Sequence, residues 1–438
     1  MTLRLTRQDR EIWRLALPAL GALVAEPLFL LVDSAVVGHL GTAQLAGLGV
    51  AAVLLTTLVT SLVFLAYATT AAVARRIGAQ DTAGALRQGV DSLWVALALG
   101  LLLAVAGLLA AEPLVAAFEP SPAVTSHAVL YLRISLLGLP AMLLVLAATG
   151  VLRGLQDTRT PLTVAGVGFA ANAVLNIALV YGVGLGLAGS AIGTVLAQLG
   201  MAAAFLSVVV RAARQHRIGL RPDWPGMRST LTAGLPLVIR TLSMRVTALA
   251  ATATATSMGD APLAGHQILT NLWITLSLIL DAVAIAGQAI TGRQLGAGDT
   301  TAVRAVSRRM IGWGVLTGLG CTGLLLAAPL YLPLFTPDPA VAGAVAGAVL
   351  VAAALQPLCG VVFVLDGILI GAGDGRYLAW ASLAATGCFL PAAWAVAVYD
   401  GGLAALWWAT GLWIAARLVA LLHRFAGSSW LVTGAVRG

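Results

Sequence analysis

The sequence predicts an all-α polytopic membrane protein with twelve transmembrane helices, arranged as two parallel six-helix repeats. Three observations predict this fold class: an apolar composition, twelve apolar runs of bilayer-spanning length, and similarity between the two halves of the chain. Sixty per cent of the 438 residues are apolar and ten per cent are charged, whereas an ordinary soluble domain carries about a quarter charged residues. Charges this sparse cannot cover a soluble surface of this size, so lipid must solvate much of the chain.

The length of the apolar runs predicts the individual spans. A helix needs about 20 mostly apolar residues to cross the hydrocarbon of a bilayer. Runs of this kind lie at 12–37, 45–74, 89–111, 126–150, 162–182, 188–211, 231–257, 262–291, 306–328, 340–371, 377–399 and 402–423. The alternating pattern of a membrane β-barrel is absent. The first run is longer than the apolar region of a cleavable signal peptide and carries acidic residues, so we expect it to stay in the membrane.

The charged residues predict the orientation of these spans. The net charge is +8, and all 25 basic residues are arginines. Arginines precede the first span and follow the even-numbered ones; the sixth, for example, is followed by Arg211, Arg214, Arg217, Arg221 and Arg228. The intervening loops hold acidic residues, at Glu112, Glu119, Asp260, Asp338 and Asp400. The positive-inside rule then places both termini in the cytoplasm, so the positive charge reflects topology and predicts no nucleic-acid partner.

The two halves of the chain resemble each other at fixed spacing, which indicates an internal repeat. Gly78-Ala79 and Asp81-Thr82 match Gly296-Ala297 and Asp299-Thr300, in each case after the second span of the half. Six spans are an even number, so both halves enter the membrane from the same side. Transporters built from parallel repeats bind substrate between the halves. We therefore expect an N-lobe (1–211), a cytoplasmic linker (212–230) and a C-lobe (231–438).

Several motifs in this repeat resemble those of the multidrug and toxic compound extrusion (MATE) transporters. The matching stretches are Leu31-Val32-Asp33-Ser34, Gly38-His39-Leu40-Gly41, Leu263-Ala264-Gly265-His266-Gln267-Ile268 and Gly371-Ala372-Gly373-Asp374. Val364-Leu365-Asp366-Gly367 resembles the DinF-like branch of that family. The resemblance implies an antiporter of the bacterial cytoplasmic membrane. It would export drug-like or toxic compounds by alternating access, coupled to H⁺ or Na⁺.

In the DinF-like branch, the resemblance assigns coupling to a first-helix aspartate, here Asp33. Its polar partners come from the fifth and sixth helices, here Asn172, Asn176 and Thr194. With a rise of about 1.5 Å per residue, Asp33, Asn176 and Thr194 should share one layer in the outer half of the N-lobe. The branch carries a second aspartate where this chain has Asn176, so we predict coupling to H⁺ rather than Na⁺. Glu26, about 10 Å deeper on nearly the same helix face, is either a second proton carrier or a structural hydrogen-bonding group.

Charged residues also lie inside the predicted spans of the second half. Arg240 and Asp281 lie at equal depth in two successive spans, so we predict an ion pair, either structural or facing the substrate cavity. Asp366 lies closer to the cytoplasmic side, and neither its partner nor that of Arg245 follows from the sequence. Arg133 lies near the outer end of its span, against the positive-inside trend. Ionisable residues at such depth are functional candidates by default.

Other function classes find little support in the sequence. A phosphate-binding loop of the P-loop type needs a lysine, which the chain lacks. No cluster suggests a metal site or a catalytic triad, and the three cysteines lie in apolar runs where packing explains them. We therefore expect a monomeric non-enzyme in membrane lipid that takes amphiphilic or cationic small molecules and no cofactor. The alternatives are a flippase for a lipid-linked precursor and an intramembrane enzyme.

Overall fold

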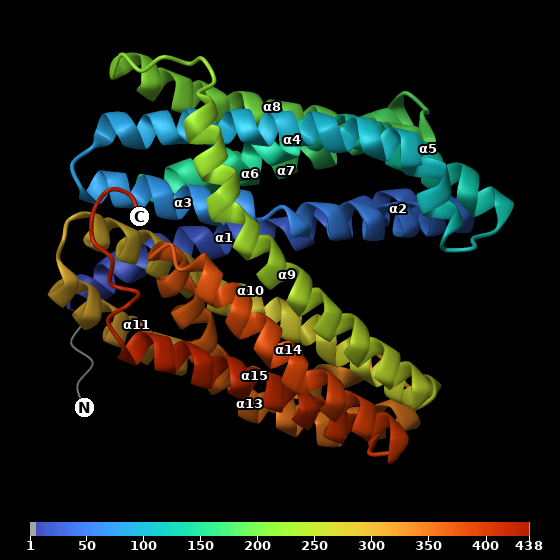
Figure 1. The fold of residues 1–438 in the computed structure, drawn as a ribbon. Helices are drawn as coiled ribbons and strands as arrows, with labels where there is room; N and C mark the ends of the chain where they lie inside the picture. The colour runs from blue at the N-terminus through green and yellow to red at the C-terminus, as the bar shows by residue number, and fades with distance from the viewer. Residues whose placement is uncertain (1–5, 438) are drawn as a thin grey trace. The chain divides into compact units, whose positions relative to one another are not determined.

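The computed structural model describes residues 6–437, except for the side chains of Glu26, Phe29 and Leu30. All regular secondary structure in this part of the chain is helical (Figure 1). Ten helices are long and apolar enough to cross a membrane, or eleven when the bent pair α5 and α6 counts as one span. Helix α1 is outside this count. The predicted class, an all-helical membrane protein, is confirmed for the described residues, and the number of twelve spans stays a prediction.

The chain folds into two compact units, and two helices pass from one unit to the other. The N-terminal unit is Gly21–Gly234, and the C-terminal unit is Leu235–Gly438 together with the described part of Met1–Leu20. Helix α1 (Arg7–Gly38) and helix α9 (Trp224–Ser257) each contain one of the two boundaries. Each compact unit therefore begins within a long helix rather than in a loop.

The boundaries of these units differ from those of the predicted lobes. The residues before Gly21 were expected in the N-lobe, but they belong to the C-terminal unit. Part of the predicted linker is helical, because α9 begins at Trp224. Sequence similarity marks where each repeat starts. The compact units instead reflect contacts in space, and the first residues of each repeat are grouped with the other half of the chain.

The contacts of Asp9 explain why the start of α1 belongs to the C-terminal unit. Its buried carboxylate accepts hydrogen bonds from Nε and Nη2 of Arg309, both at 2.7 Å, and from Nε1 of Trp313 at 2.7 Å. The Arg309 guanidinium holds the pKa of Asp9 well below its usual range. Trp13 packs edge-on against Trp313, with ring centroids 5.0 Å apart. A two-pronged, charge-assisted contact of this kind is strong and geometrically specific.

The N-terminal unit contains the rest of α1 and the helices up to the start of α9. They are α2 (Thr42–Ser61), α3 (Phe64–Gly78), α4 (Thr82–Ala116), α5 (Pro122–Leu137), α6 (Leu139–Gly154), α7 (Arg159–Ile177) with a π-helical end (Ala178–Gly182), and α8 (Gly186–Gln215). The predicted span 126–150 is bent by 49° between α5 and α6. Pro140 lies at this bend, where it lacks the N–H that would continue the helical hydrogen bonds and its ring crowds the preceding turn.

The C-terminal unit is built around one central helix. Its helices are α10 (Asp260–Gly296), α11 (Thr300–Leu326), the short α12 (Ala328–Tyr331) with a 3₁₀ turn (Leu332–Leu334), α13 (Pro339–Gly371), α14 (Gly375–Val398) and α15 (Gly402–Ala426). Helix α13 packs against α10, α11 and α15. A Cβ at Gly360 of α13 would lie 1.9 Å from the carbonyl oxygen of Gly314 in α11. Only glycine permits so close a helix contact, which is a common means of packing membrane helices.

The repeated Gly-Ala-x-Asp-Thr motif has the same conformation in both units. Asp81 caps the start of α4 by accepting from the backbone N–H of Gly84, and Asp299 caps α11 by accepting from Ala302, both at 2.8 Å. The residue before each aspartate has a positive φ, 60° at Gln80 and 80° at Gly298. An aspartate cap stabilises a helix start by satisfying a backbone N–H that has no partner in the helix. The motif thus repeats because both halves need the same turn.

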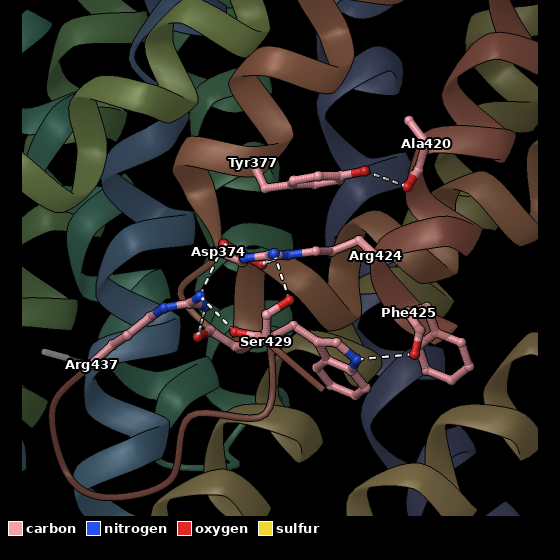
Figure 2. A network of polar contacts seen from close by, with 9 residues as sticks. Asp374, Tyr377, Ala420, Arg424, Phe425, Ser429 and Arg437 are labelled. Atoms are coloured by element: carbon pink, nitrogen blue, oxygen red, sulfur yellow. Dashed lines mark hydrogen bonds and ion pairs between the residues drawn. The ribbon is translucent and has the colours of Figure 1, made fainter. Parts of the chain in front are cut away.

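A C-terminal strap (residues 427–437) folds back along the ends of α10, α13 and α15 (Figure 2). Asp374 pairs with Arg424 of α15 at 2.7 Å and with Arg437 of the strap at 3.0 Å. Arg437 also donates to the carbonyl of Ala372 at 3.0 Å. Trp430 is fully buried, and its Nε1 donates to the carbonyl of Phe425 at 3.1 Å. The strap is therefore part of the folded unit.

We expect Arg437→Ala to lower the thermal unfolding temperature of the detergent-purified protein. The substitution removes a charge-assisted contact, worth about 1.5–3 kcal/mol, which corresponds to about 3–12 °C for a unit of this size. Tryptophan fluorescence during heating would measure it, with Val436→Ala, an exposed neighbour, as the control. Equal unfolding temperatures for both variants and the wild type would show that the strap does not stabilise the fold.

Candidate functional site

Asp33 lies near the end of α1 and accepts hydrogen bonds from three other helices. The hydroxyl of Tyr131 in α5 donates to Oδ2 at 3.0 Å. Nδ2 of Asn176 in α7 donates to Oδ1 at 2.8 Å, and Oγ of Ser190 in α8 donates to the same oxygen. The aspartate side chain is buried within the N-terminal unit. A carboxylate in this position is thus held by donors from α5, α7 and α8.

A second contact lies one helical turn from Asn176. Nδ2 of Asn172 donates to Oγ1 of Thr194 at 3.1 Å, and both side chains are buried. The amide oxygens of Asn172 and Asn176 are buried as well, and neither has a hydrogen-bond partner among the described residues. Such unsatisfied acceptors are rare in folded proteins and call for a partner such as water or an ion.

The sequence placed Asp33, Asn176 and Thr194 in one layer and named Asn172 as a further polar partner. In the structure these four residues form two hydrogen-bonded pairs, Asp33 with Asn176 and Asn172 with Thr194. Tyr131 and Ser190 also belong to the site, and sequence reasoning missed them. Ser190 lies four residues before Thr194, so the two share one face of α8. That spacing could have revealed Ser190. Tyr131 could have been found as a hydroxyl inside an apolar run.

The hydrogen bonds indicate which oxygen of Asp33 can take a proton. Oδ1 already accepts from two donors, and the amide nitrogen of Asn176 cannot accept a proton in return. Oδ2 has a single partner, the Tyr131 hydroxyl, which can turn and become an acceptor. Protonation at Oδ2 would thus keep every hydrogen bond. A monovalent cation is the other ligand that the site could hold, because the two unsatisfied amide oxygens could complete its coordination shell.

Glu26 lies on the same helix as Asp33, but its side chain is outside the part that the structure describes. The backbone of α1 is helical from Arg7 to Gly38. A separation of seven residues therefore keeps Glu26 on nearly the same side of the helix. Its role as a second proton carrier stays a prediction.

A buried ion cluster lies in the C-terminal unit. Oδ2 of Asp366 in α13 pairs with Nη2 of Arg240 in α9 at 2.7 Å, and with Nη2 of Arg417 in α15. Arg417 is 2% exposed, and its guanidinium lies over the Trp413 ring, 5.0 Å from the centroid. These contacts supply the partners of Asp366 that the sequence left open. The predicted pairing of Arg240 with Asp281 stays a prediction, and Asp281 lies half-buried on α10.

Two further charged residues of the predicted spans have different surroundings. Arg133 pairs with Glu112 at 3.0 Å, and both side chains are largely exposed. Its position against the positive-inside trend is thus offset by a neighbouring acid, although an exposed pair of this kind adds little stability. Arg245 forms no ion pair or side-chain hydrogen bond with any other residue that the structure describes.

Comparison with known proteins gives consistent results over most of the chain. The MatE family pattern matches residues 18–178 and 236–395, once in each half. The chain is 33% identical over 428 residues to Protein DETOXIFICATION 44, chloroplastic, of Arabidopsis thaliana, which covers 94% of this chain and 81% of that protein. It is 30% identical over 441 residues to DNA damage-inducible protein F of Escherichia coli (strain K12), which covers 94% of this chain and 95% of that protein.

A solved structure supports the same fold. It is described as the outward-facing conformation of a multidrug resistance MATE family transporter of the MOP superfamily. The superposition has a TM-score of 0.85 and covers 96% of both chains at 23% sequence identity. At this identity the likeness establishes the fold alone.

Proposed function

Because the chain belongs to the MatE family, whose members are membrane transporters and not enzymes, we propose that it exports drug-like or toxic organic compounds by cation-coupled antiport. The observation that carries this proposal is the buried Asp33, which accepts hydrogen bonds from three helices of one unit. A carboxyl group at this depth in a membrane protein is costly without a function. The family resemblance predicted from the sequence is confirmed, and it supplies the substrate class as small organic molecules.

We propose that transport proceeds by alternating access through twelve spans, with both termini in the cytoplasm. The ten apolar helices, the bent pair α5 and α6, and α1 would provide the twelve spans. The distribution of arginines supports the orientation. The bacterial cytoplasmic membrane is the proposed location. One relative is named chloroplastic and another is bacterial, so membrane fractionation of the source cells is the test.

We propose H⁺ as the coupling ion, because Asp33 can take a proton at Oδ2 while its hydrogen bonds are kept. Na⁺ is the second candidate, favoured by the unsatisfied amide oxygens of Asn172 and Asn176. The two ions compete for the same carboxylate, so the structure allows a direct test. Either ion would be released as the site changes its exposure.

In proteoliposomes tested with a panel of cationic and anionic fluorescent compounds, an imposed proton gradient should drive transport of at least one compound in the absence of Na⁺. A sodium gradient of the same size at equal pH on both sides should give the rate of protein-free vesicles. The reverse result, transport with the sodium gradient alone, would replace H⁺ with Na⁺ as the coupling ion. Transport with neither gradient, for any compound of a broad panel, would contradict the antiport function itself.

A further inference from the structure

Arg245 lies at the middle of a predicted membrane span. It is 14 residues from the start and 12 from the end of the run 231–257, about 21 and 18 Å along the helix. Arginine side chains reach the interface only from positions near a helix end. The guanidinium of Arg245 must therefore find its polar surroundings at this depth.

Two faces of α9 have different surroundings. One face is buried within the C-terminal unit and includes Ser243, Thr247 and Ala251. The opposite face is exposed and carries Arg245 among apolar side chains, with Leu242, Val246 and Leu249 between 46% and 71% exposed. Leu249 and Leu242 lie about 40° and 60° from Arg245 around the helix, so polar and apolar side chains share this face.

The exposed face also carries polar side chains close to Arg245. Thr252 and Thr256 are exposed, and they follow Arg245 by seven and eleven residues, which puts them within about 20° of it around the helix. Their hydroxyls donate to backbone carbonyls of the same helix, at 3.1 and 2.9 Å. Each hydroxyl oxygen can still accept a hydrogen bond. Because a charged side chain in the middle of a span is costly in lipid, the part of this face around Arg245 is suited to water.

The charges inside the C-terminal unit leave a positive excess. Its predicted spans contain three arginines away from their ends, Arg240, Arg245 and Arg417, and only two acids, Asp281 and Asp366. Whichever arginines the two acids neutralise, one positive charge remains. Asp366 already holds Arg240 and Arg417. Arg245 pairs with neither acid among the described residues, so its positive charge has no acidic partner there.

We propose that Arg245 is the anion-binding group of a water-accessible substrate site, and that this site selects amphiphilic organic anions. The inference rests on the proposed transport function and names its substrate class. A guanidinium donates two parallel hydrogen bonds to a carboxylate or sulfonate, whereas it repels an organic cation. The exposed apolar side chains beside it on α9 would contact the apolar part of such a substrate.

Two probes with the same ring and opposite permanent charge test this proposal. They are naphthalene-2-sulfonate and (naphthalen-2-yl)trimethylammonium, titrated calorimetrically into the detergent-purified full chain. The wild type should bind the sulfonate more tightly than the ammonium. Arg245→Gln should weaken sulfonate binding by about tenfold or more, because a hydrogen bond to a charged group is lost. Arg245→Lys should retain most of the affinity, and Arg211→Gln, at an exposed position in α8, should retain all of it.

Several outcomes would overturn the inference. One is tighter binding of the ammonium by the wild type, a result that does not depend on any variant. Another is unchanged sulfonate affinity in Arg245→Gln with a wild-type unfolding temperature. In proteoliposomes, equal gradient-driven transport of the ammonium by the wild type and by Arg245→Gln would uphold the transport function and overturn the anion site. Sulfonate binding that depends on Arg245, without gradient-driven transport of any compound, would uphold the anion site and overturn the transport function.

Discussion

Asp33→Asn is expected to reduce gradient-driven efflux to the rate of protein-free vesicles while the protein stays folded. Asparagine has nearly the same size as aspartate but cannot take up or release a proton in the working pH range. Its carbonyl oxygen can accept the hydrogen bonds of Asn176 and Ser190, and its amide nitrogen can donate to the Tyr131 hydroxyl. The loss should therefore be one of coupling and not of packing.

The measurement compares efflux driven by an imposed proton gradient with equilibrium binding of the same compound. Binding should persist in Asp33→Asn, because the substitution removes the coupling step alone. Asp338→Asn is a matched control: Asp338 caps α13 by accepting from Ala340 at 2.8 Å, and asparagine caps a helix equally well. Wild-type efflux by Asp33→Asn would place the coupling group elsewhere, with Glu26 as the next residue to replace.

The depth of polar residues in the N-terminal unit could be predicted from the sequence. The run lengths place the helix ends, and the constant helical rise then places Asp33, Asn176 and Thr194 in one layer. Depth does not determine which side of a helix faces the site. Tyr131 and Ser190 were missed for this reason, since both are polar residues in apolar runs and their orientation depends on how α5 and α8 pack against α1 and α7.

Contacts between distant parts of the chain could not be predicted. Asp9 and Arg309 are 300 residues apart, and nothing in either segment indicates the other. Their contact groups the start of α1 with the C-terminal unit, which is why the compact units differ from the predicted lobes. The bend between α5 and α6 does have a signal in the sequence, because Pro140 lies inside the apolar run 126–150.

The contacts within the ion cluster could not be predicted from the sequence either. The sequence indicated that Asp366 is charged and lies within a span, but the position of Arg417 depends on the packing of α15 against α13. The two residues are 51 positions apart. The sequence singled out Arg240 as a charge within a predicted span, and its contact with Asp366 depends on how α9 packs in the same unit.

Removing the carboxylate of Asp366 should be the most destabilising single change in the C-terminal unit. In Asp366→Asn the guanidinium groups of Arg240 and Arg417, both nearly buried, would lose the carboxylate that both of them contact. Breaking a buried ion pair by removing one partner costs about 3–5 kcal/mol in soluble proteins. We expect the variant to unfold at a much lower temperature than the wild type, or to be recovered in low yield.

A second substitution distinguishes loss of the ion cluster from loss of packing. Arg417→Gln alone leaves Asp366 paired with Arg240, so its effect should be smaller than that of Asp366→Asn. The double variant removes one charge of each sign and should be more stable than the sum of the single losses implies, because contacting residues are not additive. Thermal unfolding of all four proteins in one detergent gives the coupling energy directly. Additive losses would mean that the two side chains stabilise the unit independently, with their contact contributing nothing to the fold.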